Sequence, residues 1–241
     1  MKDIYHVLVR CRYQLCFLSF ALSSLAWASV PLGDYYFNQG DYLQAIENYK
    51  LITESSPNNV EAAYKLAKAY TYYAGTLSDT KEAEANYQLG ADYARKAIAI
   101  QEREPEAHME LARALGRLAQ YRGVLQSLGL AGEVKKALER ALELDPNHDG
   151  AMHALALYHD EVPFLVGGRA GESIPLFEKA IAIAPDSIIH RLEFAELLLK
   201  RNMKDEAKAQ LEALIALTPE TASQRQDFDK GQAIYQANFG E

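Results

Sequence analysis

The chain has 241 residues, of which 49% are hydrophobic and 24% are charged, and its formal net charge at pH 7 is −8. This composition excludes a disordered or fibrous protein and leaves room for one sizeable core or one repeat array. The excess of acid argues against nucleic acid as a partner, because affinity for phosphates rests on Lys and Arg side chains that neutralise them.

The first 28 residues differ in kind from the rest. Three bases precede the apolar run LCFLSFALSSLAWA, which ends in the small-x-small pattern Ala26-Trp27-Ala28. This order predicts a secretory signal peptide cleaved before Ser29, and hence an exported protein, periplasmic in a bacterium and otherwise secreted. A retained anchor is the alternative, but a spanning helix needs about 20 apolar residues, and this run is shorter and interrupted by serines.

Both cysteines, Cys11 and Cys16, lie inside that segment. The sequence after it therefore excludes a disulfide framework, a thiolate nucleophile and a Cys-ligated zinc site. No later stretch is apolar enough to span a bilayer, so we expect no stable membrane span once the segment is removed.

In the remaining chain, several predicted helices end in the same way. Their last turns and the residues that follow are near copies of one pattern, as in RKAIAIQEREPE, KKALERALELDPN and FEKAIAIAPDS. Proline suits this place because it cannot continue one helix and is tolerated in the first turn of the next. The prolines of these stops are Pro57, Pro105, Pro146, Pro185 and Pro219, at spacings of 48, 41, 39 and 34 residues.

A spacing of 34 residues is the period of the tetratricopeptide repeat (TPR), a helix-turn-helix unit. The chain resembles this family most clearly in its first and last units, LGDYYFNQGDYLQAIENYKLITESSP and FAELLLKRNMKDEAKAQLEALIALTP. In the first of these, Gly33 and Ala45 take the small positions where the paired helices cross, and Tyr49 takes a large one. A single helix pair cannot bury its apolar face alone, so each must stack on the next.

We therefore expect an all-α protein, a right-handed superhelical TPR solenoid of about five helix pairs with a C-terminal capping helix. The array spans residues 29–220, in units 29–59, 60–104, 105–146, 147–185 and 186–219, and residues 221–241 form the capping helix. Extra residues of the middle units are expected as loops between the paired helices, in GTLSDTKEAEAN, AQYRGVLQSLGLAGE and EVPFLVGGRAGES, where Gly, Ser, Thr and Asp cluster.

Within the TPR superfamily, residues 60–220 resemble the regulators of microtubule dynamics. The resemblance rests on an irregular helix pair, on the long-armed unit containing Tyr121-Arg122-Gly123-Val124, on ALELDPNHDGAMHALALYHDEVP, and on EKAIAIAP. It implies a helical domain that contacts a partner or a lipid, and not an enzyme.

In this family the first helix of each pair lines the concave face, so the resemblance implies a set of candidate binding residues there. Three of them, Lys68, Arg113 and Arg117, would form a local basic patch within an acidic molecule. The alternative is that these bases pair with nearby acids such as Glu61 or Glu110 on a solvated helix face. The candidate residues are Phe37, Tyr64, Lys68, Tyr72, Met109, Arg113, Arg117 and His153.

Other motifs give no convincing chemistry. His148, His153 and His159 are separated by five and six residues, so no pair of them can chelate one ion within a single helix. The glycines of LVGGRAGES lack the G-x-x-x-x-G-K-[ST] pattern of a phosphate-binding loop, and no serine stands in a G-x-S-x-G turn. We expect no catalytic residues, no metal and no cofactor.

The sequence therefore favours a non-enzymatic scaffold whose concave groove captures a peptide or helix of a partner envelope protein. A second interpretation is a carrier, in which the long inter-helix arms close over a small hydrophobic or anionic ligand.

Overall fold

The computed structural model describes residues 28–122 and 124–240, so the predicted signal peptide lies outside the described residues. Eleven α-helices and two short 3₁₀ helices make up this part of the chain. They are α2 (Val30–Asn38), α3 (Tyr42–Ser55), α4 (Val60–Thr76), α5 (Thr80–Ile100), α6 (Pro105–Ala119), α7 (Val124–Leu144), α8 (Asp149–Glu161), η1 (Phe164–Val166), η2 (Ala170–Glu172), α9 (Ser173–Ile183), α10 (Ile188–Lys200), α11 (Lys204–Ile215) and α12 (Ala222–Phe239).

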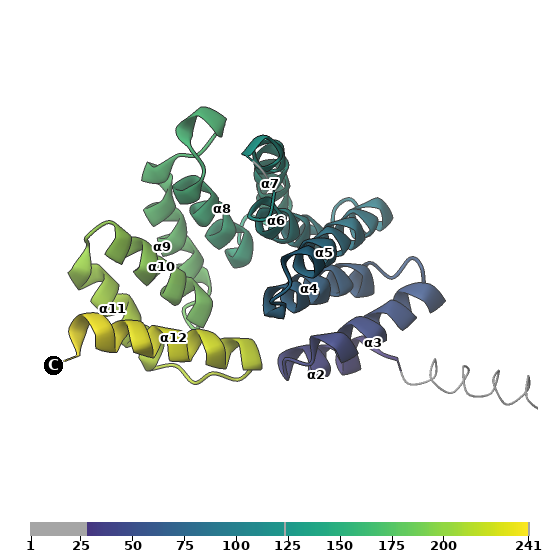
Figure 1. Cartoon of the computed structure of the whole chain (residues 1–241), viewed down its shortest axis with the longest axis horizontal. Coiled ribbons are helices and arrows are strands. Elements are labelled where there is room, and N and C mark those ends of the chain that lie inside the picture. Colours follow the sequence, from purple (N-terminus) through teal and green to yellow (C-terminus); the bar gives the residue numbers. More distant parts are fainter. Residues whose placement is uncertain (1–27, 123, 241) are drawn as a thin grey trace, which may run out of the picture.

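The helices stack as consecutive pairs, from α2 and α3 to α10 and α11, and α12 follows as a single helix (Figure 1). Each range expected for a unit holds one pair. The array curls so strongly that α12 returns to the neighbourhood of α2 and α3, which gives the molecule the outline of an almost closed ring. The predicted all-α TPR solenoid is confirmed. None of the described helices is long and apolar enough to cross a membrane.

Local sequence explains where most helices begin. Side chains of Ser29, Asp41, Asn59 and Asp79 accept hydrogen bonds from backbone N–H groups in the first turns of α2, α3, α4 and α5. These residue types are preferred at this position because the first N–H groups of a helix have no partner within it. Thr221 adds a capping box with Gln224 at the start of α12, and Pro105 opens α6.

The core forms between neighbouring units, as expected for a solenoid. The largest cluster joins α4 to α8 and includes the fully buried Leu115, Leu118 and Leu138. Smaller clusters hold α2 to α4 around Tyr49 and α8 to α11 around Phe177. Each cluster draws on more than one helix pair, so each pair depends on its neighbour.

Two of the three expected inter-helix loops are wrong. Most of GTLSDTKEAEAN and AQYRGVLQSLGLAGE is helical, because α5 begins at Thr80 and α7 at Val124, and each of these helices has 21 residues. The extra length of these units therefore extends their second helices. Asp79 caps α5 with hydrogen bonds to two N–H groups, and strong helix formers such as Ala, Glu and Leu follow it. Only EVPFLVGGRAGES is irregular, with η1 and η2 inside it.

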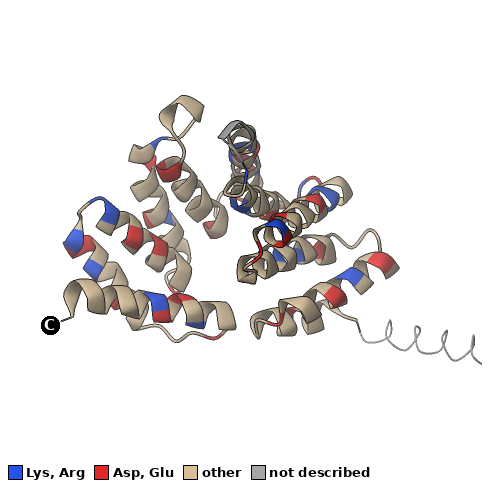
Figure 2. Ribbon diagram, viewed as in Figure 1, with Lys and Arg blue, Asp and Glu red and all other residues tan. Residues whose placement is uncertain are grey.

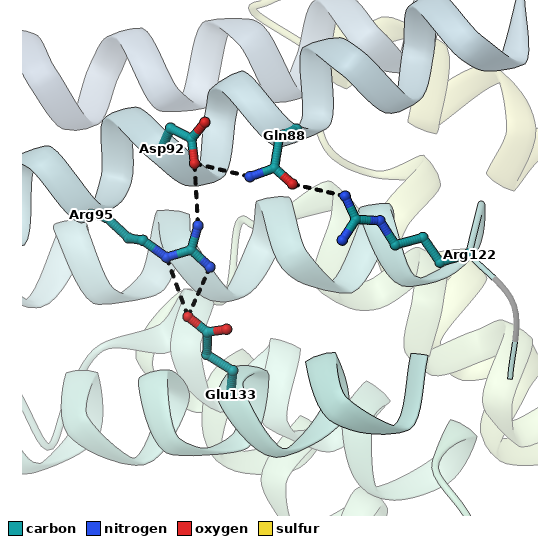
Figure 3. Close-up of polar contacts among 5 residues, drawn as sticks. All are labelled: Gln88, Asp92, Arg95, Arg122 and Glu133. Carbon is teal, nitrogen blue, oxygen red and sulfur yellow. Dashed lines mark hydrogen bonds and ion pairs between the residues drawn. The ribbon is translucent and has the colours of Figure 1, made fainter. Parts of the chain in front are cut away.

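Ion pairs on the outer surface join helices of adjacent units. The guanidinium of Arg95 in α5 donates to Asp92 of its own helix and to Glu133 in α7, while Arg122 donates to Gln88 (Figure 3). Another pair, Glu102–Arg140, repeats the spacing of 38 residues seen in Arg95–Glu133. Exposed pairs of this kind contribute only about 0–1 kcal/mol each. Their regular spacing shows that α7 runs in a constant register beside α5 and the turn that follows it.

Candidate functional site

The first helices of the early units bring aromatic and basic side chains together. The ring of Phe37 lies 5.0 Å from that of Tyr72 and 5.3 Å from that of Tyr42, between centroids. The Lys68 ammonium lies 5.2 Å from the centre of the Phe37 ring, and the Arg113 guanidinium lies 5.7 Å from that of Tyr72. We call these five residues the aromatic cluster. All are partly exposed, so their cation–π contacts are worth about 0.5–1 kcal/mol each and leave surface for a ligand.

The aromatic cluster contains four of the eight predicted residues, namely Phe37, Lys68, Tyr72 and Arg113. It also contains Tyr42, which we did not predict because it starts a second helix, α3. The signal was present in the Gly40-Asp41-Tyr42 turn: a residue directly after a tight turn lies beside the end of the preceding helix.

The three predicted bases differ in their ion pairing. Arg113 donates to Glu110 at 3.0 Å, and Glu110 is 1% exposed. Burial opposes the charge of Arg113, but Glu110, Tyr72 and Glu106 outweigh that effect and raise its pKa. Lys68 and Arg117 have no carboxylate within 4.0 Å among the described residues, and it is Lys65 that pairs with Glu61. The ion-pair alternative therefore holds for Arg113 and not for the other two.

Arg117 faces acids from three other helices. Its positive charge acts to lower the pKa of Glu161 at the end of α8, of Glu193 in α10 and of Asp227 in α12. We use the name inner face for these four residues together with the aromatic cluster. A Cβ built on Gly116, next to Arg117, meets no atom of the described chain within 4 Å. This part of α6 therefore faces open space.

The acids of the inner face repel one another. Burial and the nearby Glu193 and Glu196 raise the pKa of Asp227 to about 6, although Lys230 and Arg117 oppose the shift. Lys230 pairs with Glu196 at 2.7 Å. Burial also raises the pKa of Glu161, with a further contribution from Glu193. The inner face thus has a basic, aromatic side formed by α2 to α6 and an acidic side formed by α8 to α12.

The structure places the remaining predicted residues differently. Met109 is 2% exposed and packs in the main core, so it cannot line a groove. Tyr64 packs beside Ala63, Ala97 and Ala107, two turns away from Tyr72 along α4. His153 is 9% exposed because it packs on Phe177 and His190, with its Nε2 atom 2.7 Å from Glu193 Oε2. The stacking of neighbouring units covers Met109 and His153, whereas Tyr64 stays partly exposed but lies away from the aromatic cluster.

All five histidines of the described residues are buried. His148 caps α8, and the His108 Nε2 atom lies 2.7 Å from the carbonyl oxygen of Glu102. Burial and the neighbouring His153 lower the pKa of His190 to about 3, so it is neutral at physiological pH. No group of three potential metal ligands occurs in the described part of the chain. These histidines therefore serve packing and helix capping.

A hollow of about 430 Å³ lies between α11 and α12. It is lined by Ile215, Asp229, Gln232, Ala233, Tyr235 and Gln236. The carrier interpretation expects the ligand under the long inter-helix arms of the middle units, and this hollow lies at the C-terminal end of the array instead. This hollow gives no support to the carrier interpretation.

Charges of both signs are distributed over all the helix pairs (Figure 2). A nucleic-acid surface would instead gather Lys and Arg on one face. The inner face also carries both signs, with Lys68 and Arg117 on its basic side and Glu161, Glu193 and Asp227 on its acidic side. The arrangement suits a protein partner with charges of its own.

Comparisons with known proteins agree with this architecture. Residues 32–165, more than half of the chain, match the family Regulator of microtubule dynamics protein 1-3, and residues 167–228 match the Tetratricopeptide repeat family. Regulator of microtubule dynamics protein 1 of Bos taurus is 28% identical over 127 residues, covering 50% of this chain and 40% of that protein. Anaphase-promoting complex subunit 7 of Arabidopsis thaliana is 26% identical over 98 residues, or 41% of this chain and 16% of that protein.

Solved structures show the same fold. A TPR protein of Thermus thermophilus superposes with a TM-score of 0.68 at 20% identity, covering 85% of this chain and 97% of that one. PilF of Pseudomonas aeruginosa gives 0.51 at 18% identity, covering 90% and 93%. At these identities the likeness concerns the fold alone. The chain spans about 40% of the length of the regulator proteins it matches. The match from α2 to α8 places it in the Regulator of microtubule dynamics protein 1-3 family, built as an array of tetratricopeptide repeats.

Proposed function

We propose that this protein is a non-enzymatic scaffold that captures a peptide or helix of a partner protein on its inner face. The observation that carries the proposal is the aromatic cluster together with two bases, its own Lys68 and the nearby Arg117 on α6, that have no acidic partner within 4.0 Å in the described chain. Partly exposed aromatic rings supply contact area at low entropic cost, and aromatic and Arg residues are enriched among those that dominate binding energy.

The two bases orient the partner. A carboxylate on the bound segment would accept charge-assisted hydrogen bonds from Lys68 or Arg117 without first breaking an internal ion pair. Arg113 is less suited, because its charge is already held by the buried Glu110. The expected partner segment is therefore one that carries an apolar or aromatic anchor and an acidic group near it.

The proposal is tested by reversing the two unpaired bases together. In the variant Lys68→Glu, Arg117→Glu, affinity for an acidic helical peptide selected from a display library should fall at least tenfold, with helix content unchanged, because exposed charges contribute about 0–1 kcal/mol each to folding. The matched control is Lys50→Glu, Lys179→Glu, which reverses two exposed bases on second helices. Equal affinity of both double variants at low salt would refute the proposal.

We also propose that the protein acts outside the cytoplasm, on an envelope partner. This rests on the basic start, the apolar run and the Ala26-Trp27-Ala28 pattern. Expression in the native host followed by intact-mass measurement tests it: a mass that begins at Ser29 supports export, and recovery of the chain with Met1 excludes cleavage.

A further inference from the structure

We infer that the loop between α8 and α9 docks the protein on a lipid bilayer, with Phe164 and Leu165 inserting into the interface of zwitterionic lipids. We call residues 163–168 of this loop the tip. In Figure 1 the segment between α8 and α9 projects at the top, on the side of the array away from α12. The inference goes beyond the proposed function and does not rest on it, because the tip shares no residue with the inner face.

The tip exposes two large apolar side chains that are neighbours in the chain. Phe164 is 82% exposed and Leu165 is 93% exposed, whereas Tyr35, the next large apolar side chain in the described part of the chain, reaches 58%. Both belong to η1, and successive side chains of a 3₁₀ helix point about 120° apart. Two side chains that diverge in this way are both exposed only where the backbone itself protrudes, so the tip is convex.

Backbone hydrogen bonds hold the tip in this shape. The N–H groups of Val166 and Gly168 donate to the carbonyl oxygen of Pro163 at 3.0 and 3.2 Å. The hydroxyl of Tyr158, a buried residue of α8, donates to the Val166 carbonyl oxygen at 3.0 Å. Gly167 has a φ of +101°, a conformation that favours glycine. The apolar side chains therefore cannot fold back onto the core without breaking a closed turn that is anchored on α8.

The small area of the tip favours a bilayer over a second protein. Two large side chains offer on the order of 300 Å² of apolar surface. A stable protein interface buries about 800 Å² on each partner and needs a complementary surface. A bilayer needs no such complementarity, because apolar side chains at its interface are buried by a fluid, to a depth of about 5–10 Å.

The charges beside the tip indicate which lipids it meets. Arg169 pairs with Glu172 at 3.1 Å, and Lys135, which lies beside Gly167, pairs with Glu139 at 3.7 Å. Bases that are matched by acids attract anionic headgroups weakly, and the net charge of −8 disfavours such lipids further. The expected surface is therefore zwitterionic, and binding should change little with salt.

The apolar side chains set the strength of docking. Complete burial of Phe164 and Leu165 corresponds to a gain of about a hundredfold to ten-thousandfold in partition into the bilayer. A single myristoyl chain, with a binding constant of about 10⁴ M⁻¹, gives only reversible attachment. The tip should likewise hold the protein at a membrane reversibly.

A single tryptophan at the tip tests the insertion directly. Trp27 is the only tryptophan of the chain, so a chain that begins at Ser29 has none, although it contains every described helix. It also lacks the apolar N-terminal run, which would bind lipid by itself. With phosphatidylcholine vesicles, the fluorescence of Phe164→Trp should shift to shorter wavelength and be quenched by brominated acyl chains. Tyr35→Trp, an exposed aromatic position on α2, is the control and should show neither effect.

A second experiment removes the apolar side chains. Phe164→Ser, Leu165→Ser should lower flotation with phosphatidylcholine vesicles at least tenfold with unchanged helix content, because both side chains lie outside the core. The matched control Leu43→Ser, Ile183→Ser removes two exposed apolar side chains elsewhere and should float as the unsubstituted chain does.

Three results would overturn the inference. They are the absence of a spectral shift at position 164, equal flotation of the two double variants, and self-association without lipid that the tip variant abolishes, which would make the tip an interface between copies. None of these results affects peptide capture on the inner face, so this inference and the proposed function can fail separately.

Discussion

Replacing Gly33 by alanine should destabilise the protein, because a tyrosine ring already takes the space of the added methyl group. A Cβ built on Gly33 lies 2.3 Å from the Cε1 atom of Tyr49, which is 1% exposed. The Tyr49 hydroxyl donates to Asp34 at 2.5 Å, and Asp34 also accepts from the Lys65 ammonium at 2.7 Å. The ring therefore cannot retreat without disturbing this chain of contacts.

The expected magnitude combines three effects. Overpacking a filled core costs about 1–3 kcal/mol. Losing a hydrogen bond to a charged group costs about 1.5–3 kcal/mol. The higher helix propensity of alanine stabilises the folded protein by at most about 1 kcal/mol relative to glycine. The net loss for Gly33→Ala is then roughly 1.5–5 kcal/mol, and each kcal/mol should lower Tm by about 2–4 °C in a chain of this size.

Thermal unfolding measures this effect, and Gly116→Ala is the control. The same substitution at Gly116, inside α6, meets open space, so only the gain in helix propensity remains and Tm should rise slightly. The two variants thus make the same chemical change with opposite expected signs. If Gly33→Ala raised Tm as Gly116→Ala does, the close helix crossing at Tyr49 would not constrain the first unit.

Further predictions concern a buried acid, the capping helix and the inner face. Burial opposes the charge of Asp160, but Lys200 and Arg201, each at 2.7 Å, outweigh it and lower its pKa below 3.8. Asp160→Asn should therefore lower Tm at pH 7, by about 1–2 kcal/mol in stability, and the difference should shrink as the pH falls through the lowered pKa. Deletion of residues 221–241 should uncover the last apolar cluster and cause aggregation, seen by light scattering; a monomer with unchanged Tm would contradict the capping role. Gly116→Trp should fill the open space on α6 and abolish peptide capture with little change in Tm, and normal capture would place the ligand elsewhere.

Much of the fold was predictable because its signals are local. Helix stops that contain proline, caps such as Asp41 and Asn59, and small residues at helix crossings all act within one repeat unit. Their recurrence was enough to predict the helix pairs and their stacking. The loops of the second and third units were wrong because strong helix formers after Asp79 and Val124 extended α5 and α7, and residue type alone did not show where each helix would begin.

The sites were harder to predict because they depend on neighbouring units. Helical spacing placed Phe37, Lys68 and Tyr72 on one face, and they do meet. The same spacing placed Met109 there, but the next unit covers it, and only packing between units decides which side chains of a face stay exposed.

The sequence by itself determined that this protein is a TPR array, since period, caps and small residues are properties of the chain read in order. Only the tertiary structure decided how far the array curls, because that depends on small rotations added over successive helix pairs. That curl brings Ala222 to Gly40, a contact between residues about 180 positions apart in sequence that no local pattern relates.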